Sequence, residues 1–129
     1  MPYINLELQP APTPEQSTRL ARGITDAMVE VTNKRGEVTA VRIASSQNLW
    51  TIGGEAINTP TAYMDVKITA GTNTTEEKAA LQQHLHRLLI DTLGELAEAS
   101  YIVIHELPAE NWGYAGISQS ARAQQNQRT

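Results

Sequence analysis

The chain opens with Met1-Pro-Tyr-Ile-Asn-Leu-Glu-Leu8, and this stretch decides the fold. Its apolar and polar residues alternate, with Ile4, Leu6 and Leu8 set against Tyr3, Asn5 and Glu7. That alternation is typical of a strand with one buried face. We therefore predict a first strand whose inward face belongs to the core.

Pro2 stands at the start of this strand. Removal of Met1 would leave the secondary amine of Pro2 as the first atom of the chain. An α-amino group titrates near neutral pH, and burial or a neighbouring cation lowers its pKa by disfavouring the charged form. Such an amine could act as a base, but proline is also an ordinary second residue. The rest of the chain has to decide between these two interpretations.

The composition excludes several classes of protein. The chain has 129 residues, of which 40% are hydrophobic and 19% charged, and it contains no cysteine. Disulfides, thiolate catalysis and zinc–thiolate sites are therefore excluded. The net charge of -4 gives no basic surface for nucleic acid, and no apolar run approaches the ~20 residues of a membrane span. We expect a cytoplasmic protein that binds neither nucleic acid nor membrane.

The segment after the first strand predicts an amphipathic helix. Thr13-Pro14-Glu15-Gln16 has the form of a capping box. Apolar residues then follow at helical spacing: Leu20, Ala21, Ile24, Ala27, Met28 and Val31. Asn33-Lys-Arg-Gly36 is typical of a helix end. A strand containing Arg42 is predicted over residues 38–44, and an aromatic, glycine-rich hairpin over residues 49–57.

The second half of the chain repeats this order. It has an alternating strand around Met64 to Ile68, a second capping box at Thr74-Thr75-Glu76-Glu77, a leucine-rich helical stripe, a strand at Tyr101–Leu107 and a glycine-rich segment at Asn111–Gly116. The helix positions Leu20, Ile24 and Met28 correspond to Leu81, Leu85 and Leu89, each 61 residues later. We interpret the chain as a duplicated β-α-β unit.

The duplication predicts the architecture. A β-α-β crossover makes its two strands parallel and right-handed. Two such units side by side give an α/β (α+β) fold, with a four-stranded sheet and two helices on one face. We expect one domain made of units 2–57 and 62–118, followed by a solvated or partner-binding tail over 119–129. The uncovered face should carry apolar residues buried by partner subunits, which predicts a ring-shaped oligomer, most simply a homotrimer.

Taken together, these motifs resemble the tautomerase superfamily. The resemblance rests on the Met-Pro start, the Thr-x-x-Glu-type helix starts, Thr39-Ala-Val-Arg-Ile43, Trp50-Thr-Ile-Gly-Gly54 and Asn111-Trp-Gly-Tyr-Ala-Gly116. It covers the chain to about Ala121 and is strongest to fused, double-length forms of 4-oxalocrotonate tautomerase. Members of that family move a proton in an enol or dienol of a 2-oxo acid and use an N-terminal proline as the base and acid. The resemblance thus implies a tautomerase that needs no cofactor and no metal.

The resemblance also assigns site residues. It places the catalytic base on Pro2, the arginine that holds the substrate anion on Arg42, and the aromatic wall on Trp50 and Trp112. An arginine fits this role because its guanidinium fork binds a carboxylate or enolate oxygen. The alternative for Arg42 is a salt-bridged surface residue, and each Trp could instead be a packing residue.

The chain departs from the family pattern at two places. The family's second arginine, in the first turn, would fall on Pro12, which cannot bind an anion through its side chain. The corresponding turn of the second half offers Thr72 and Asn73, and Tyr101 stands where that half would carry its strand arginine. The start of the second half has no free amine, and its in-phase positions are Ala62 and Met64, so only one proline per chain can work.

Two alternative functions stay open. The related dehalogenase branch would make the chain a promiscuous hydratase or dehalogenase of acrylate-type acids, but no convincing water-activating residues are present. The absence of the turn arginine favours a non-enzymatic oligomeric binding protein of the same fold, whereas the retained Pro2 opposes it. The histidines add little, because His84 and His86 face different directions on a helix and His105 is best explained as a structural residue.

Overall fold

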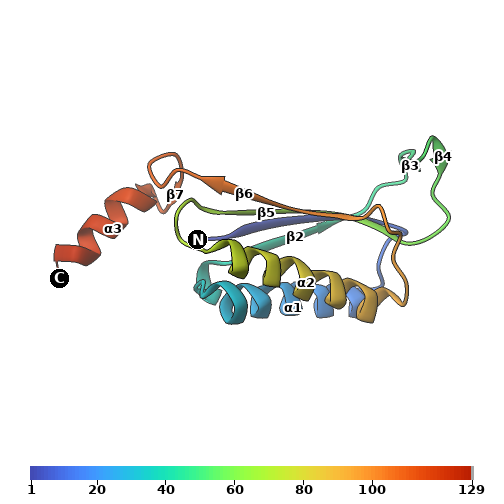
Figure 1. Cartoon of the computed structure of the whole chain (residues 1–129), viewed down its shortest axis with the longest axis horizontal. Coiled ribbons are helices and arrows are strands. Elements are labelled where there is room, and N and C mark those ends of the chain that lie inside the picture. Colours follow the sequence, from blue (N-terminus) through green and yellow to red (C-terminus); the bar gives the residue numbers. More distant parts are fainter. Residues whose placement is uncertain (129) are drawn as a thin grey trace.

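The computed structural model describes residues 1–128, with the side chains of residues 1–125. Its elements follow the predicted order (Figure 1). The long elements are β1 (Tyr3–Gln9), α1 (Pro14–Thr32), β2 (Ala40–Ala44), β5 (Thr61–Thr69), α2 (Thr75–Leu93) and β6 (Tyr101–Leu107). Short elements complete the described chain: the 3-10 helix η1 (Gly36–Val38), β3 (Thr51–Ile52), β4 (Glu55–Ala56), β7 (Gly113–Tyr114), β8 (Ile117–Ser118) and α3 (Gln119–Arg128).

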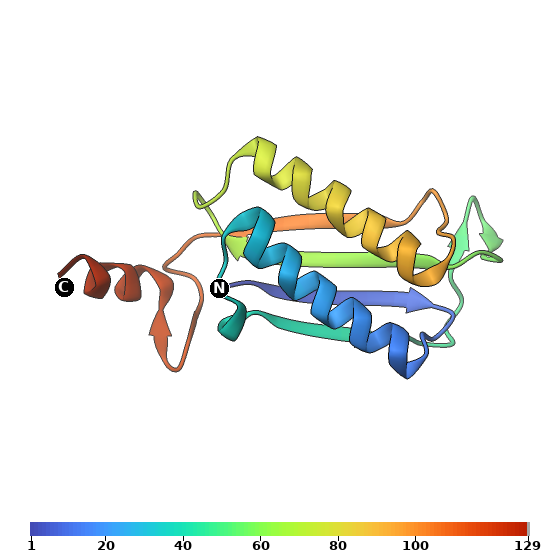
Figure 2. The same cartoon turned by 90° about the horizontal axis from the view of Figure 1, so that it is seen from below.

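The main sheet has four strands in the order β2-β1-β5-β6. The pairs β1–β2 and β5–β6 are parallel, as the two crossovers require, and β1 and β5 join the halves in antiparallel register. Figure 2 shows both long helices on the same face of this sheet. The predicted fold class is confirmed, and β1 is an interior strand with a hydrogen-bonded neighbour on each side.

The core lies between the sheet and the two helices. Its strand residues are the alternate positions of β1 and β5, namely Ile4, Leu6, Leu8, Ala62, Met64, Val66 and Ile68. The helices supply the predicted stripes, with Leu20, Ile24, Ala27, Met28, Leu81, Leu85 and Leu89 all buried. The apolar residues predicted from the strand alternation and from the helical spacing therefore form one buried cluster.

Both predicted capping boxes are present. The Thr13 hydroxyl accepts a bond from the Gln16 amide (3.1 Å), and the Gln16 side chain accepts one from the Thr13 amide (2.9 Å). Thr74 and Glu77 make the same pair of bonds at 3.1 and 2.8 Å. These bonds satisfy backbone donors that have no partner within the helix.

α1 ends at the first residue of the predicted stretch Asn33-Lys-Arg-Gly36. Asn33, with φ of 57°, closes the helix in the left-handed conformation, which Asn tolerates better than most residues. Gly36 begins η1, so the following strand starts at Ala40 and not at Val38 as predicted. A short segment that contains η1 thus connects α1 to the start of β2.

The uncovered face of the sheet is more polar than predicted. In β1 and β5 it carries Tyr3, Asn5, Glu7, Tyr63, Asp65 and Lys67, the positions that alternate with the buried set. Arg42 Nη1 donates to Asn5 Oδ1 at 3.1 Å, and His105 Nε2 lies 2.7 Å from Asp65 Oδ1. On the two central strands this face therefore carries polar, charged and tyrosine side chains where apolar residues were expected.

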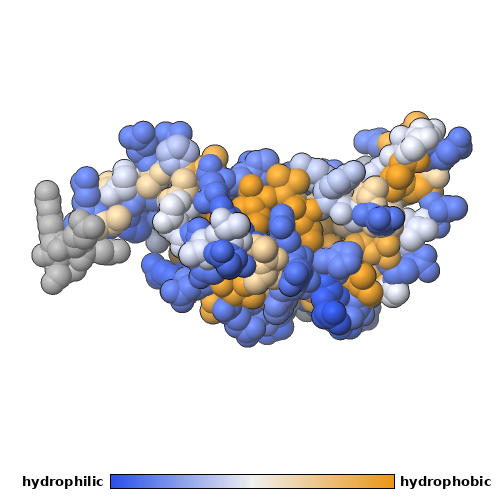
Figure 3. Space-filling view, viewed as in Figure 1, coloured by the Kyte–Doolittle hydropathy of each residue, from blue (hydrophilic) through white to orange (hydrophobic). Residues whose placement is uncertain are grey.

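Apolar surface lies instead along an edge of the sheet. The middle of the face in Figure 3 is apolar over β6, whose Ile102, Val103 and Ile104 are half-buried. Tyr101 at the start of the strand is 59% exposed. A strand edge of this kind has unpaired backbone groups that another chain can use.

The tail is helical, which the sequence did not reveal. In Figures 1 and 2, α3 lies beyond the end of the sheet at which the N-terminus lies. The Arg122 guanidinium stacks 3.8 Å from the centre of the Tyr114 ring and donates to the Tyr114 carbonyl at 2.8 Å. These contacts fix the start of α3 to the β7–β8 hairpin.

The core predicts a difference between two apolar residues of α1. We expect Ile24→Ala, which truncates a residue with 0% exposure, to lower the free energy of unfolding by about 3 kcal/mol. Val29→Ala on the same helix, at 41% exposure, should cost under about 1 kcal/mol. Urea unfolding at one fixed protein concentration measures both values, and equal losses would contradict the assigned core.

Candidate functional site

Pro2 is buried at the end of the sheet where α1 returns. Its carbonyl accepts a bond from the Ala40 amide at 3.2 Å, which ties the start of β1 to the start of β2. Because β1 and β2 are parallel, the crossover must bring the C-terminus of α1 and the loop after it to this end. The loop residues 33–39 therefore lie at this end of the sheet, near the start of β1.

Two cations from this loop act on the terminal amine. Burial, followed by the charges of Lys34 and Arg35, lowers the pKa of the Met1 amino group below its ordinary value. Each effect disfavours the protonated form. The environment of the Met1 amine therefore shifts its equilibrium toward the neutral form.

The two cations have different partners. Arg35 is exposed and forms an ion pair with Glu37 at 2.8 Å, and its Nη1 also lies 3.5 Å from the Tyr114 hydroxyl. Lys34 is half-buried, and its Nζ donates to the Thr72 hydroxyl at 2.6 Å. Burial lowers the pKa of Lys34, while Glu77 and Glu106 oppose that shift and favour the charged ammonium.

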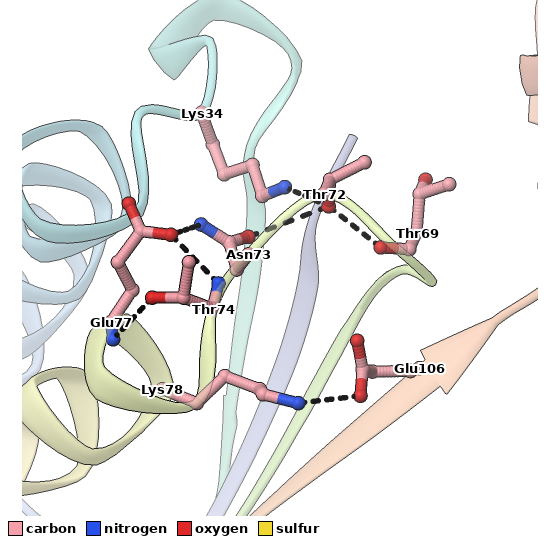
Figure 4. A network of polar contacts seen from close by, with 8 residues as sticks. All are labelled: Lys34, Thr69, Thr72, Asn73, Thr74, Glu77, Lys78 and Glu106. Carbon is pink, nitrogen blue, oxygen red and sulfur yellow. Dashed lines mark hydrogen bonds and ion pairs between the residues drawn. The ribbon is translucent and has the colours of Figure 1, made fainter.

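Figure 4 shows that Lys34 reaches a turn of the second repeat. The Thr72 hydroxyl accepts the hydrogen bond from Lys34 and donates one to the Thr69 carbonyl at 2.7 Å. Beside it, Asn73 Nδ2 donates to the carbonyl of Thr32, the last residue of α1, at 3.0 Å. This turn, which the sequence marked only for lacking an arginine, holds the C-terminal end of α1 in place.

Arg42 and Trp50 come together at the other end of β1. They line one cavity of about 230 Å³, together with Glu7, Leu8, Gln9, Ala44, Ser45 and Ser46. Pro2 is not among these residues, and the strand rise puts Glu7 about 16 Å from it along β1. The structure therefore brings Arg42 and Trp50 together but does not join either of them to Pro2 of the same chain.

Trp112 lies elsewhere, in the segment around the β7–β8 hairpin. It lines a cavity of about 290 Å³ with Glu110, Asn111, Gly113, Gly116, Ile117 and Ser118. Its buried Nε1 has no hydrogen-bond partner among the described residues. A Cβ on Gly113 would lie only 2.1 Å from the Ile117 carbonyl oxygen, so the hairpin requires glycine at that position. Trp112 and Trp50 therefore do not share a wall within one chain.

Sequence reasoning missed Lys34 and Arg35 as neighbours of Pro2. The signal was present, because a parallel β-α-β unit returns the residues after its helix to the beginning of its first strand. Within the sequence, Asn33-Lys-Arg-Gly36 indicates only a helix end. By the same rule Pro12, which lies between β1 and α1, belongs to the end of the sheet away from Pro2.

Other features of the described residues add no site. They contain no cluster of three or more His, Asp or Glu that could hold a metal ion. None of the helices within residues 1–128 is both long enough and apolar enough to cross a bilayer. His105 is paired with Asp65, while His84 and His86 lie on the outer side of α2, beside a shallow surface hollow.

Comparisons with known proteins agree with this geometry. The family model described as "Tautomerase enzyme" matches residues 2–59 and again 63–122. "Probable tautomerase K2" of Dickeya dadantii is 35% identical over 63 residues, which are 49% of this chain and 94% of that protein. "2-hydroxymuconate tautomerase" of Comamonas testosteroni is 37% identical over 43 residues, 33% of this chain and 68% of that protein. A solved structure described as a fused 4-OT symmetric trimer superposes with a TM-score of 0.82 at 23% identity, over 93% of this chain and 98% of the other.

The turn beside Lys34 predicts a pH effect on stability. Hydrogen bonds from the Thr74 backbone and from Asn73 lower the pKa of Glu77. A depressed carboxyl pKa stabilises the fold above the unfolded pKa, about 4.3, and this contribution is lost as pH falls through the folded pKa. Glu77→Gln should therefore lose less stability between pH 7 and about pH 3.5 than the wild type does.

Urea midpoints at both pH values measure the difference. The control is Glu76→Gln, which changes the exposed neighbouring glutamate. An identical acid loss in Glu77→Gln and wild type would refute the assignment.

Proposed function

The chain belongs to the tautomerase family, and from this premise we propose that it is an isomerase that moves a proton within the enol or dienol of a 2-oxo acid. The observation that carries the proposal is the buried N-terminal segment beside Lys34 and Arg35. The base is the amine of Pro2, freed by removal of Met1. With Met1 attached, the Pro2 nitrogen is an amide without basicity.

The chemistry needs one group that first accepts and then returns a proton. A secondary amine of near-neutral pKa meets this need, because both of its protonation states are populated at working pH. The neutral amine takes the proton of the enol or of an adjacent carbon, and the resulting ammonium delivers it to another carbon of the conjugated system. Positive charge nearby stabilises the enolate oxygen that develops between the two steps. The substrate class is an acid of the 2-hydroxymuconate or phenylenolpyruvate type.

We assign Arg42 to the substrate anion, with Trp50 as the apolar wall beside it. Pro2 of the same chain does not line their cavity, so the proposed site is completed between subunits, with Pro2 from one chain and Arg42 from another. The edge strands β2 and β6 support association, because each has one unpaired side in the sheet. The proposed assembly is a homotrimer with three sites. Trp112 serves as a second wall near the amino terminus of a neighbouring subunit.

The base is tested by Pro2→Ala. We expect the correctly processed variant to lose at least about 100-fold in kcat with phenylenolpyruvate or 2-hydroxymuconate, since general acid–base catalysis contributes that much or more. Pro14→Ala, the same replacement at the start of α1, is the control and should keep its activity. Intact-mass measurement confirms loss of Met1 in each preparation. Full activity in Pro2→Ala would remove the mechanism.

The shared site is tested by mixing two inactive variants. Pro2→Ala and Arg42→Ala chains, unfolded together and refolded, should recover activity, because some interfaces then combine an intact Pro2 with an intact Arg42. Each variant refolded alone should stay inactive. The control is Arg22→Ala, which removes an arginine from the exposed side of α1 and should be active when refolded alone. No recovery in a mixture shown by native mass spectrometry to contain mixed oligomers would mean that both residues act within one chain.

A further inference from the structure

We infer that the cavity of Arg42 and Trp50 accepts an acid with a single carboxylate, and that Glu7 is the residue that rejects a second one. The inference rests on the proposed function, since it chooses between the two substrate types named there. It favours an enol acid with an uncharged far end, of the phenylenolpyruvate type, over a dicarboxylic dienol of the 2-hydroxymuconate type.

The positive charge of this cavity comes from one side chain. Among the described residues that line it, Arg42 alone is a cation. Arg42 Nη1 donates to Asn5 Oδ1 at 3.1 Å, and Asn5 is also its partner in the β1–β2 register. A neutral amide fixes the guanidinium without cancelling its charge. The guanidinium has five N–H donors, so this bond leaves others for one substrate carboxylate.

Glu7 brings a negative charge into the same wall. Side chains alternate along β1, so Glu7, two residues beyond Asn5, faces the same side of the sheet as Arg42. A strand spacing of about 4.8 Å and a two-residue rise of about 6.6 Å place the Cα atoms of Glu7 and Arg42 about 8 Å apart. Glu7 is exposed and has no ion-pair partner among the described residues. Its carboxylate is therefore available to repel an anion in the cavity.

The rest of the wall cannot compensate a second negative charge. Gln9 Nε2 already donates to the Asn48 carbonyl at 2.9 Å. The hydroxyls of Ser45 and Ser46 can donate hydrogen bonds but carry no charge. The apolar part of the wall consists of Leu8, Ala44 and Trp50. An uncharged far end therefore fits this cavity better than a carboxylate does.

The connecting segments at this end of the sheet add further negative charge. β1 and β2 end here, and β5 and β6 begin here; Figure 1 shows β3 and β4 at the same end, away from the N-terminus. Residues 10–13, 45–60 and 94–100 connect these elements and contain no Lys or Arg. Their charged residues are Glu55, Glu95 and Glu98. A second carboxylate at this end of the chain therefore meets only like charge.

Two acids with the same carbon skeleton test the effect of the second charge. Sorbate and trans,trans-muconate share one conjugated diene and differ only at the far end, which is a methyl group in sorbate and a carboxylate in muconate. A titration followed by the indole N–H signal of Trp50 gives both dissociation constants without turnover. At low ionic strength we expect the wild type to bind sorbate roughly tenfold more tightly than muconate. Added salt should reduce this ratio, because it screens the repulsion.

Four variants separate charge from shape. Glu7→Gln removes the charge at nearly constant volume and should strengthen muconate binding several-fold while leaving sorbate binding unchanged. Glu7→Asp keeps the charge and should keep the preference for sorbate. Glu30→Gln makes the same change in net charge on the exposed side of α1 and should leave the ratio at its wild-type value. Arg42→Met should lose both acids.

The outcomes distinguish this inference from the proposed function. Muconate binding as tight as sorbate binding in the wild type would overturn the inference, and would show that cations outside the cavity hold the second carboxylate. A preference for sorbate that persists in Glu7→Gln would overturn the role of Glu7. Failure of both acids to bind, in a protein that turns over phenylenolpyruvate, would overturn the assignment of the cavity itself. A sorbate preference that Glu7→Gln abolishes, in a protein that turns over neither enol acid, would support the inference about the cavity and remove the isomerase proposal.

Discussion

Pairing of β1 on both of its sides fixes the amino terminus of this protein in the sheet. β1 bonds to β2 in parallel and to β5 in antiparallel register, and Ile4, Leu6 and Leu8 on its inner face are buried. A terminus at the edge of a sheet would fray, whereas this one begins a strand with a neighbour on each side. The position of Pro2 is thus determined by the core, so the amine proposed to form there after removal of Met1 has little conformational freedom to lose.

The crossover then determines what surrounds that amine. A parallel β1–β2 pair joined by α1 must return the chain to the start of β1, and the returning loop carries Lys34 and Arg35. The antiparallel β1–β5 pair brings the end of β5, and with it Thr72, to the same place. Duplication of the β-α-β unit therefore supplies a second turn at the terminus, and that turn binds the end of the first helix.

The sequence predicted most of the fold because its signals were local and agreed with one another. Thr13 and Thr74 began the two helices as expected, and the β6 boundaries, Tyr101 and Leu107, were read correctly. The misses arose where tertiary context decides. The strand that holds Arg42 starts at Ala40 and not at Val38, because η1 precedes it, and α3 formed from a polar segment whose Arg122 is fixed by Tyr114, 8 residues earlier.

The site was less predictable than the fold. The resemblance directed attention to Arg42, whose guanidinium is bonded to Asn5 and lines a cavity away from Pro2. Lys34 has no signal in a linear motif, because its relation to Pro2 depends on the crossover and its relation to Thr72 on the pairing of two repeats. The central claim is that the Pro2 nitrogen is a neutral amine at pH 7. The ¹⁵N chemical shift of Pro2 in wild-type protein, followed against pH, tests it most directly: the account predicts a titration midpoint below the ordinary value of about 8 for a terminal amine, and an amide shift that does not titrate, or a midpoint at or above that value, would contradict it.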